Sequence, residues 1–204
     1  MIALLTACAS PPPDVLIVTL DTTRADAIGA YGGPATPAID ALAASGVRVD
    51  EAMSVAPLTV PAHASLMTGL YPARHGVRGN DGEPLGEDAR TLAEVLRDAG
   101  WRTAAFVSAA VLDDAFGLDQ GFDVYEDPGV ATRRDAEETG NAANAWLAAQ
   151  PPGPLLLWVH FYDAHQPVAD YDAAVGRTDR QIANLREHLR LLGRERVVVV
   201  VAGD

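Results

Sequence analysis

The sequence contains no lysine, and its 15 basic residues are all arginine. Aspartate and glutamate number 28, so the 204-residue chain has a formal net charge of −13. A protein that binds nucleic acid through the phosphate backbone needs a basic surface. The composition therefore predicts no nucleic-acid partner.

Cysteine is almost absent, since Cys8 is the single one. One thiol cannot form an intrachain disulfide or a thiolate metal cluster, so any metal site must use oxygen and imidazole ligands. No apolar run reaches the roughly 18 residues of a bilayer-spanning helix. Apolar residues still make up 49% of the chain, which predicts a folded α/β domain with a real core.

The segment before residue 14 differs from the rest. Residues 1–7 are largely apolar, Leu5–Cys8 resembles the bacterial lipobox, and Pro11–Pro13 follow as an extended tether. A complete signal peptide has a basic start and about 15 to 30 residues, whereas seven residues precede Cys8 and none is basic. We interpret residues 1–13 as a truncated lipoprotein signal and tether. We expect a periplasmic or cell-envelope protein that meets the membrane only through a lipid on Cys8; the alternative is a disordered terminus with a chance cysteine.

Residues 14–204 alternate between continuous apolar runs, typical of buried strands, and helical patterns. The predicted strands are Asp14–Leu20, Thr103–Val107, Leu155–Phe161 and Val197–Val201. Helices are predicted over Pro37–Ser45 with Thr36 as N-cap, over Leu92–Ala99, and around 135–149 and 171–192. In the last, one buried stripe is expected from Val175, Ile182, Leu185, Leu189 and Leu192. This alternation predicts a mostly parallel sheet sandwiched by helices.

Polar residues follow the first, third and fourth of these apolar runs. They are Asp21, the stretch from Tyr162 to His165, and Asp204. Ligands of parallel sheets bind outside the carboxyl ends of the strands, so these side chains are expected to meet at one rim. Alternation along the third run places His160 toward the core.

Residues 56–72 carry the most informative pattern. Pro61 fits the first turn of a helix and Gly69 its end, which places Thr59 just before the helix N-terminus. There a hydroxyl faces free N–H groups and the positive end of the helix dipole, where an anionic ester or an alkoxide is stabilised. Without its context, Thr59 would be interpreted as an ordinary N-cap.

This stretch resembles the sulfatase signature C/S-x-P-x-R followed by A-S-L-x-T-G, and the match continues through Arg74–Val77. Val15–Asp26, Gly100–Ala104, Asp163–His165 and the valine run into Asp204 resemble further segments of the family, in the same order. The resemblance implies an alkaline phosphatase/sulfatase-like fold, with residues 14–204 forming a partial catalytic domain. It also implies a hydrolase or transferase acting on anionic phosphate or sulfate esters.

Departures from the signature alter the expected chemistry. Sulfatases oxidise the signature cysteine or serine to formylglycine, whereas oxidation of Thr59 would give a ketone. Threonine is the nucleophile in phosphoglycerol transferases and nucleotide pyrophosphatases of the same superfamily, so we interpret Thr59 as a nucleophile and expect phosphodiesters to be preferred over sulfate esters. His63 replaces the signature arginine and could orient or share a proton with Thr59. Val107–Ala110 lacks the lysine and histidine that the family carries there.

By resemblance, Asp21, Thr59 and Asp204 would bind one divalent cation, with Ca²⁺, Mg²⁺ or Mn²⁺ favoured by oxygen ligands. The family's neighbour of Asp21 is a second aspartate, replaced here by Thr22. His165 is expected to contact the substrate or protonate the leaving group, with Asp163 bracing it. The family also implies a further ligand directly after Asp204 and a C-terminal subdomain. The alternative hypothesis is therefore a catalytically incompetent fragment or pseudoenzyme.

Overall fold

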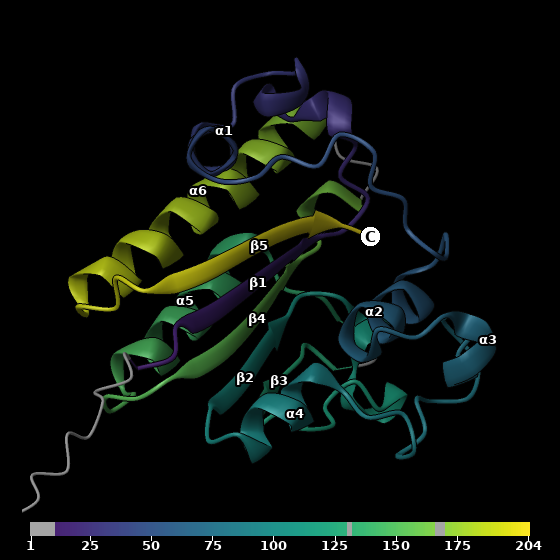
Figure 1. The fold of residues 1–204 in the computed structure, drawn as a ribbon. Coiled ribbons are helices and arrows are strands. Elements are labelled where there is room, and N and C mark those ends of the chain that lie inside the picture. The colour runs from purple at the N-terminus through teal and green to yellow at the C-terminus, as the bar shows by residue number, and fades with distance from the viewer. Residues whose placement is uncertain (1–10, 130–131, 166–169) are drawn as a thin grey trace, which may run out of the picture.

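The computed structural model describes residues 11–129, 132–165 and 170–204; Cys8 and the lipobox lie outside them. Five parallel strands form one sheet in the order β3-β2-β4-β1-β5 (Figure 1). The strands are β1 Asp14–Leu20, β2 Arg102–Val107, β3 Val124–Glu126, β4 Leu155–Phe161 and β5 Val197–Gly203. The predicted α/β fold with a mostly parallel sheet is confirmed.

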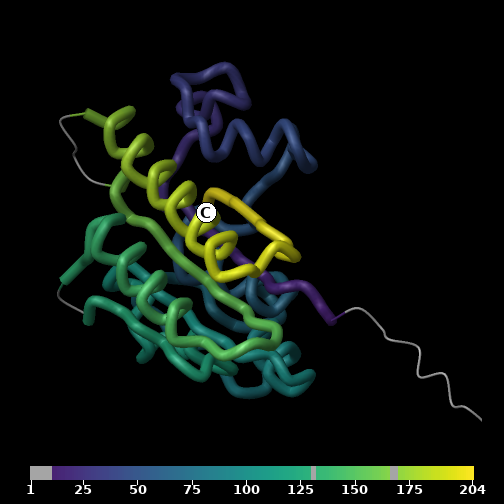
Figure 2. Tube along the Cα trace, turned by 90° about the vertical axis from the view of Figure 1, so that its left-hand side faces the viewer, coloured from purple at the N-terminus to yellow at the C-terminus, as the bar shows by residue number. Residues whose placement is uncertain are grey.

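Helices cover both faces of the sheet (Figures 1 and 2). The α-helices are α1 Pro37–Ser45, α2 Thr59–Thr68, α3 Pro72–His75, α4 Leu92–Asp98, α5 Ala136–Ala148 and α6 Tyr171–Leu191. Short 3₁₀ turns cover Ala25–Ala27, Gly29–Tyr31, Ala110–Leu112, Asp114–Phe116 and Asp163–His165. No helix within the described residues is both long and apolar enough to cross a membrane.

Two apolar cores result, one on each face. The side chains of α1, α5 and α6 pack against one face of β1, β2 and β4, and those of α2 and α4 pack against the other. Strand β4 is buried along its whole length, as expected for a strand with helices on both sides. The second face carries the site, because α2 crosses it at the carboxyl ends of the strands.

The helix boundaries follow their local sequence signals. Thr91 and Asp135 begin α4 and α5 with capping boxes, in which each side chain accepts from the backbone N–H three residues on. Helix α1 begins after Thr36 as predicted, but the Thr36 hydroxyl does not cap it. That hydroxyl bonds Asp40 instead.

Three details of the prediction are wrong. Val197–Val201 lies in the edge strand β5, so its residues alternate in exposure rather than being buried on both faces. Leu192 leaves the buried stripe of α6 because it is the C-cap residue, where the chain turns away, and it is 40% exposed. The three-residue β3 was not predicted, because Val124–Glu126 is too short to show a periodicity.

Candidate functional site

Strand register brings the two predicted carboxylates together. Leu20 of β1 pairs with Phe161 on one side and with Gly203 on the other. Asp21 and Asp204, each one residue beyond, therefore stand at the same level of the sheet rim. The backbone N–H of Thr22 joins them by donating to Asp204 Oδ1 at 3.1 Å.

Helix α2 carries Thr59 to these carboxylates. Its N-cap is Leu58, so Thr59 is the first residue of the helix rather than the one before it, which corrects the prediction by one position. The Thr59 hydroxyl donates to Asp21 Oδ2 at 3.3 Å, and the side chain is buried. At the following residue, the Val60 N–H donates to the side-chain oxygen of Asn80 at 3.0 Å. The nucleophile candidate is thus held against a carboxylate at the positive end of a helix.

His63 lies one turn further along α2 and points into the same place. Its Nδ1 is 2.8 Å from the backbone oxygen of Thr59 and 4.0 Å from Asp204 Oδ2. The carbonyl can only accept, so Nδ1 carries the ring proton. Burial, with the His160 ring beside it, lowers the pKa of His63 to about 3, which keeps the ring neutral. Contact with the Thr59 backbone agrees with an orienting role, and its proton-sharing role stays a prediction.

His160 is a residue of the site that sequence reasoning misplaced. It is fully buried, as expected, but its Nε2 lies 3.4 Å from Asp21 Oδ2 instead of within apolar core. Its β4 position pairs with Thr19, two residues before Asp21, and alternate residues of a strand share a face. The alternation was informative, but the register that puts Asp21 on that face could not be read from the sequence.

The site has the chemical properties of a cation site. Asp21 Oδ1 and both nitrogens of His160 are buried and have no hydrogen-bond partner, although buried polar groups are normally paired. Burial and the neighbouring Asp21 carboxylate raise the pKa of Asp204, against the Thr22 N–H. Ligand atoms from His63, His160 and Asp204 lie within 4.8 Å of one another. A divalent cation would partner the unpaired atoms and offset the carboxylate repulsion.

His165 lies apart from this cluster. It occupies the turn after β4, is exposed, and its ring stacks on that of Tyr162 with centroids 4.3 Å apart. Asp163 does not brace it, because its buried carboxylate pairs with Arg177 Nε at 3.1 Å. That part of the prediction is wrong. Within the described residues, the His165 ring has no hydrogen bond or ion pair with Asp21, Thr59 or Asp204, so its substrate role stays a prediction.

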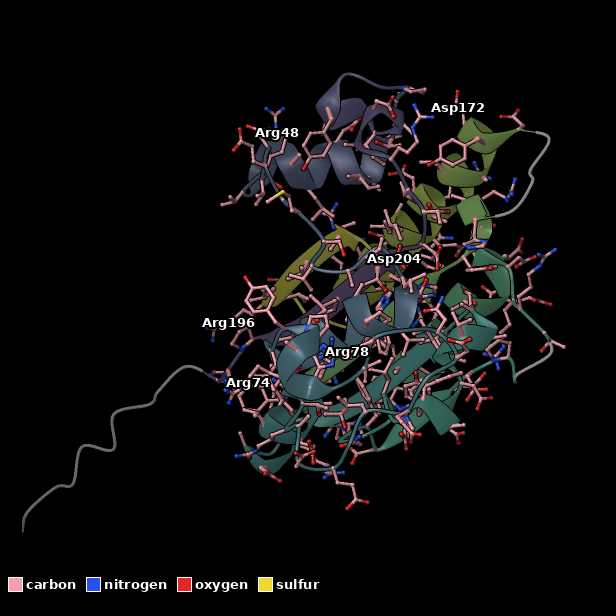
Figure 3. The ribbon with its side chains drawn as sticks, turned by 90° about the vertical axis from the view of Figure 1, so that its right-hand side faces the viewer. Arg48, Arg74, Arg78, Asp172, Arg196 and Asp204 are labelled. Carbon is pink, nitrogen blue, oxygen red and sulfur yellow. The ribbon has the colours of Figure 1, made fainter. Side chains whose placement is uncertain are left out.

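Asp204 and two arginines lie on one side of the molecule. Figure 3 shows Asp204 near the middle of that side, at the end of β5 and next to α2, with Arg78 and Arg74 below it. Both arginines are exposed.

Comparison with known proteins gives matches over nearly the whole described chain. Residues 13–204 match the family model described as Sulfatase. A Delta 4,5-hexuronate-2-O-sulfatase of Bacteroides thetaiotaomicron is 28% identical over 188 residues, which cover 86% of this chain and 39% of that protein. The uncharacterized sulfatase YidJ of Escherichia coli is 37% identical over 93 residues, or 45% of this chain and 18% of that protein.

Solved structures share the fold of this chain. The crystal structure of phosphonate monoester hydrolase of Agrobacterium radiobacter superposes with a TM-score of 0.77 at 18% identity, covering 93% of this chain and 62% of that one. Identity this low supports the fold alone. The chain spans well under half the length of the two curated relatives above and less than two thirds of this structure.

Proposed function

Since this chain belongs to the sulfatase family, we propose that it is the catalytic part of a metal-dependent hydrolase or transferase that acts on phosphate or sulfate esters through Thr59. The observation that carries the proposal is the Thr59 hydroxyl, buried at the start of α2 and 3.3 Å from Asp21 Oδ2. A hydroxyl that serves only as an N-cap would instead accept from backbone N–H groups of its own helix. Thr59 is instead the first residue of α2, and its hydroxyl donates to Asp21.

Asp21 and Asp204 would hold the metal with the Thr59 oxygen, as the unpaired Asp21 oxygen and the raised pKa of Asp204 suggest. When bound, a divalent cation supplies electrostatic stabilisation of negative charge on the nucleophile and on the ester oxygens. The names of the relatives fit both ester classes, since one is a sulfatase and another a phosphonate monoester hydrolase.

Each residue of the site has a proposed part in the reaction. Thr59 Oγ gives its proton to Asp21 Oδ2, to which it already donates, and bonds to phosphorus or sulfur. The ester's alcohol leaves with a proton, for which His165 is the proposed donor or contact. Water or a second alcohol next attacks the Thr59 ester, releasing the acid or the transferred ester and restoring the hydroxyl. His63 orients Thr59 through its backbone oxygen. We propose phosphodiesters as the preferred substrates, because threonine cannot form the formylglycine aldehyde.

The test offers a phosphodiester and a sulfate monoester to the protein with Mn²⁺, Mg²⁺ or Ca²⁺. Thr59→Ala should lower the rate at least about a thousandfold, as expected when a nucleophile is removed. Thr68→Ala is the matched control, since that threonine lies at the other end of α2 and bonds only the backbone groups of Ala64 and Leu70. Turnover that survives Thr59→Ala would remove the nucleophile, and metal binding without turnover would favour the non-catalytic alternative.

We also propose a periplasmic or cell-envelope location, with a lipid on Cys8 as the only membrane contact. The lipobox-like Leu5–Cys8 and the three prolines support it. Expression of the chain with Cys8 or Cys8→Ser in bacteria fed radiolabelled fatty acid tests it. Label should enter the first protein and not the second, and equal labelling would exclude the anchor.

A further inference from the structure

We propose that His160 is a nitrogen ligand of the cation held by Asp21 and Asp204, and that this nitrogen makes the site select Zn²⁺ over Ca²⁺ and Mg²⁺. The inference rests on the proposed function, because it assumes a cation at those carboxylates. It goes further by adding a ligand from β4 and by choosing between classes of metal.

The first support is the state of the His160 ring. It is fully buried, and neither of its nitrogens has a hydrogen-bond partner. A neutral imidazole always has one donor and one acceptor nitrogen, and leaving such a group unpaired in the interior is unfavourable. A bound ion would use the acceptor nitrogen.

The second support is distance. His160 Nε2 is 3.4 Å from Asp21 Oδ2. Nitrogen and oxygen ligands lie about 2.1 Å from Zn²⁺, so two ligands of one ion are at most about 4.2 Å apart. The separation fits two ligands of a common ion. It is also longer than a usual N–H···O bond of about 2.9 Å.

His63 also has a buried nitrogen without a hydrogen-bond partner, Nε2, but the approach of its ring to a carboxylate, at 4.0 Å, is longer than that of His160. The Nδ1 of His63 is the ring atom nearest Asp204, but that atom donates its proton to the Thr59 carbonyl. The His160 backbone is held by Ser108, whose Oγ donates to the His160 backbone oxygen at 2.7 Å. The two rings stand edge to face, with centroids 5.1 Å apart. We therefore assign ligation to His160 and orientation of Thr59 to His63.

The consequence concerns metal choice. Ca²⁺ and Mg²⁺ prefer sites made of oxygen alone, whereas imidazole favours Zn²⁺ and other transition metals. A site with two carboxylates, one hydroxyl and one imidazole belongs to the second group. The single thiol of the chain, Cys8, lies outside the described residues. Among the side chains of the described site, the histidine nitrogen is therefore the softest ligand.

Pulsed EPR of the chelator-treated, Mn²⁺-loaded chain tests the ligand directly. With ¹⁵N-histidine incorporated, we expect magnetic coupling between Mn²⁺ and a histidine nitrogen, lost in His160→Asn and retained in His63→Asn. His188→Asn on α6 is the control for removing a histidine elsewhere. Absence of coupling in the unsubstituted chain, or its persistence in His160→Asn, would overturn the proposal.

Affinity measured by equilibrium dialysis gives the second readout. Zn²⁺ should bind at least about a hundredfold tighter than Mg²⁺, and His160→Asn should weaken Zn²⁺ binding at least about tenfold while leaving Mg²⁺ binding within about twofold. An unchanged ratio of the two affinities in His160→Asn would contradict the selectivity claim.

Two further variants keep the outcome decisive. If His160→Asn and His160→Gln both fail to fold by circular dichroism, His63→Asn decides: coupling that survives supports His160, and coupling that disappears overturns it. Asp21→Asn separates the two proposals. If Asp21→Asn loses metal binding while the parent chain shows no nitrogen coupling, only the assignment of His160 as a ligand is rejected. If Asp21→Asn binds metal as the parent chain does, the metal site of the proposed function is rejected.

Discussion

Thr22 adopts a backbone conformation that threonine normally avoids. Its φ is 49°, which makes it the one non-glycine residue in the left-handed region among the residues described. That region costs a non-glycine residue about 1–2 kcal/mol. The strain turns the chain immediately after β1 and directs the Thr22 N–H at Asp204. Strained backbone of this kind is common at functional sites.

Thr22→Gly should therefore raise the free energy of unfolding by about 0.5–1 kcal/mol, since relief of strain exceeds the entropy that glycine adds to the unfolded chain. Urea denaturation of the metal-free protein measures it. Thr23→Gly is the control, because Thr23 is not in the left-handed region and its substitution should destabilise. If both variants lose stability equally, Thr22 is not strained.

His75 links the segment after α2 back to that helix. Its Nδ1 accepts from the Val77 N–H, and its Nε2 donates to Ser65 Oγ at 2.8 Å, which in turn donates to the Pro61 backbone oxygen. Nδ1 therefore has to be unprotonated in the folded state. Burial lowers the pKa of His75 below its ordinary 6.5, in agreement with this arrangement.

Stability should depend on pH through this residue. Below about pH 6.5 the unfolded chain binds a proton at His75 that the folded chain does not, so the stabilisation is present above that pH and is lost as the pH falls. The slope is at most about 1.4 kcal/mol per pH unit. Denaturation curves measured from about pH 7.5 to 5 should show a smaller slope in His75→Gln than in the parent chain. A slope in His75→Gln equal to that of the parent chain would contradict this account.

At the scale of elements, α1 is held to α6 by a carboxylate. Asp179, in the middle of α6, is buried and accepts from the N–H groups of Ala38 and Ile39 at 2.9–3.2 Å. It occupies the N-terminus of α1, where negative charge is favourable. Because Asp179 caps α1 in place of the Thr36 hydroxyl, that hydroxyl can bond Asp40 instead.

Asp179→Ala should lower the free energy of unfolding by about 2–4 kcal/mol, because hydrogen bonds to a charged group are each worth about 1.5–3 kcal/mol and their buried donors would be left unpaired. Asp179→Asn keeps one acceptor oxygen and should lose about half as much. Asp172→Ala, in the exposed first turn of α6, is the matched control and should cost less than about 1 kcal/mol. A loss at Asp179 no larger than at Asp172 would show that α1 does not depend on this contact.

These elements show which parts of the fold the sequence predicts. Four strands and five helices were predicted within about two residues, because continuous apolar runs and caps such as Thr91 and Asp135 are local signals. The cap of α1 was not predictable, since Asp179 lies 141 residues from Ala38. Contacts that depend on register or on helix packing have no local signal.

At the scale of the whole molecule, the site also combines residues that local sequence signals predict with residues whose placement depends on the fold. The motif around Thr59 and the acidic strand ends identified Asp21, Thr59, His63 and Asp204, and the fold brings these four together. His160 was missed because its role depends on the pairing of β4 with β1. The register sets which face of each strand meets α2, and this cannot be read from either strand alone.

The same sheet that builds the site leaves β5 at its edge. Within the described residues β5 pairs only with β1, and Val198 and Val200 are 48% and 40% exposed. An edge strand with unpaired backbone groups and apolar side chains is a template for pairing with another chain. The net charge of −13 opposes association, but charge repulsion is screened within about 8 Å at physiological salt.

We therefore expect the described part of the chain to self-associate through β5 as concentration or salt rises. Val200→Lys should shift the protein toward monomer in analytical ultracentrifugation, because a lysine on an edge strand disfavours strand pairing. Val95→Lys adds the same charge at a 44% exposed position on α4, away from the edge, and should leave association unchanged. If both variants dissociate alike, net charge rather than the β5 edge controls assembly, since the two substitutions differ only in where the lysine is placed.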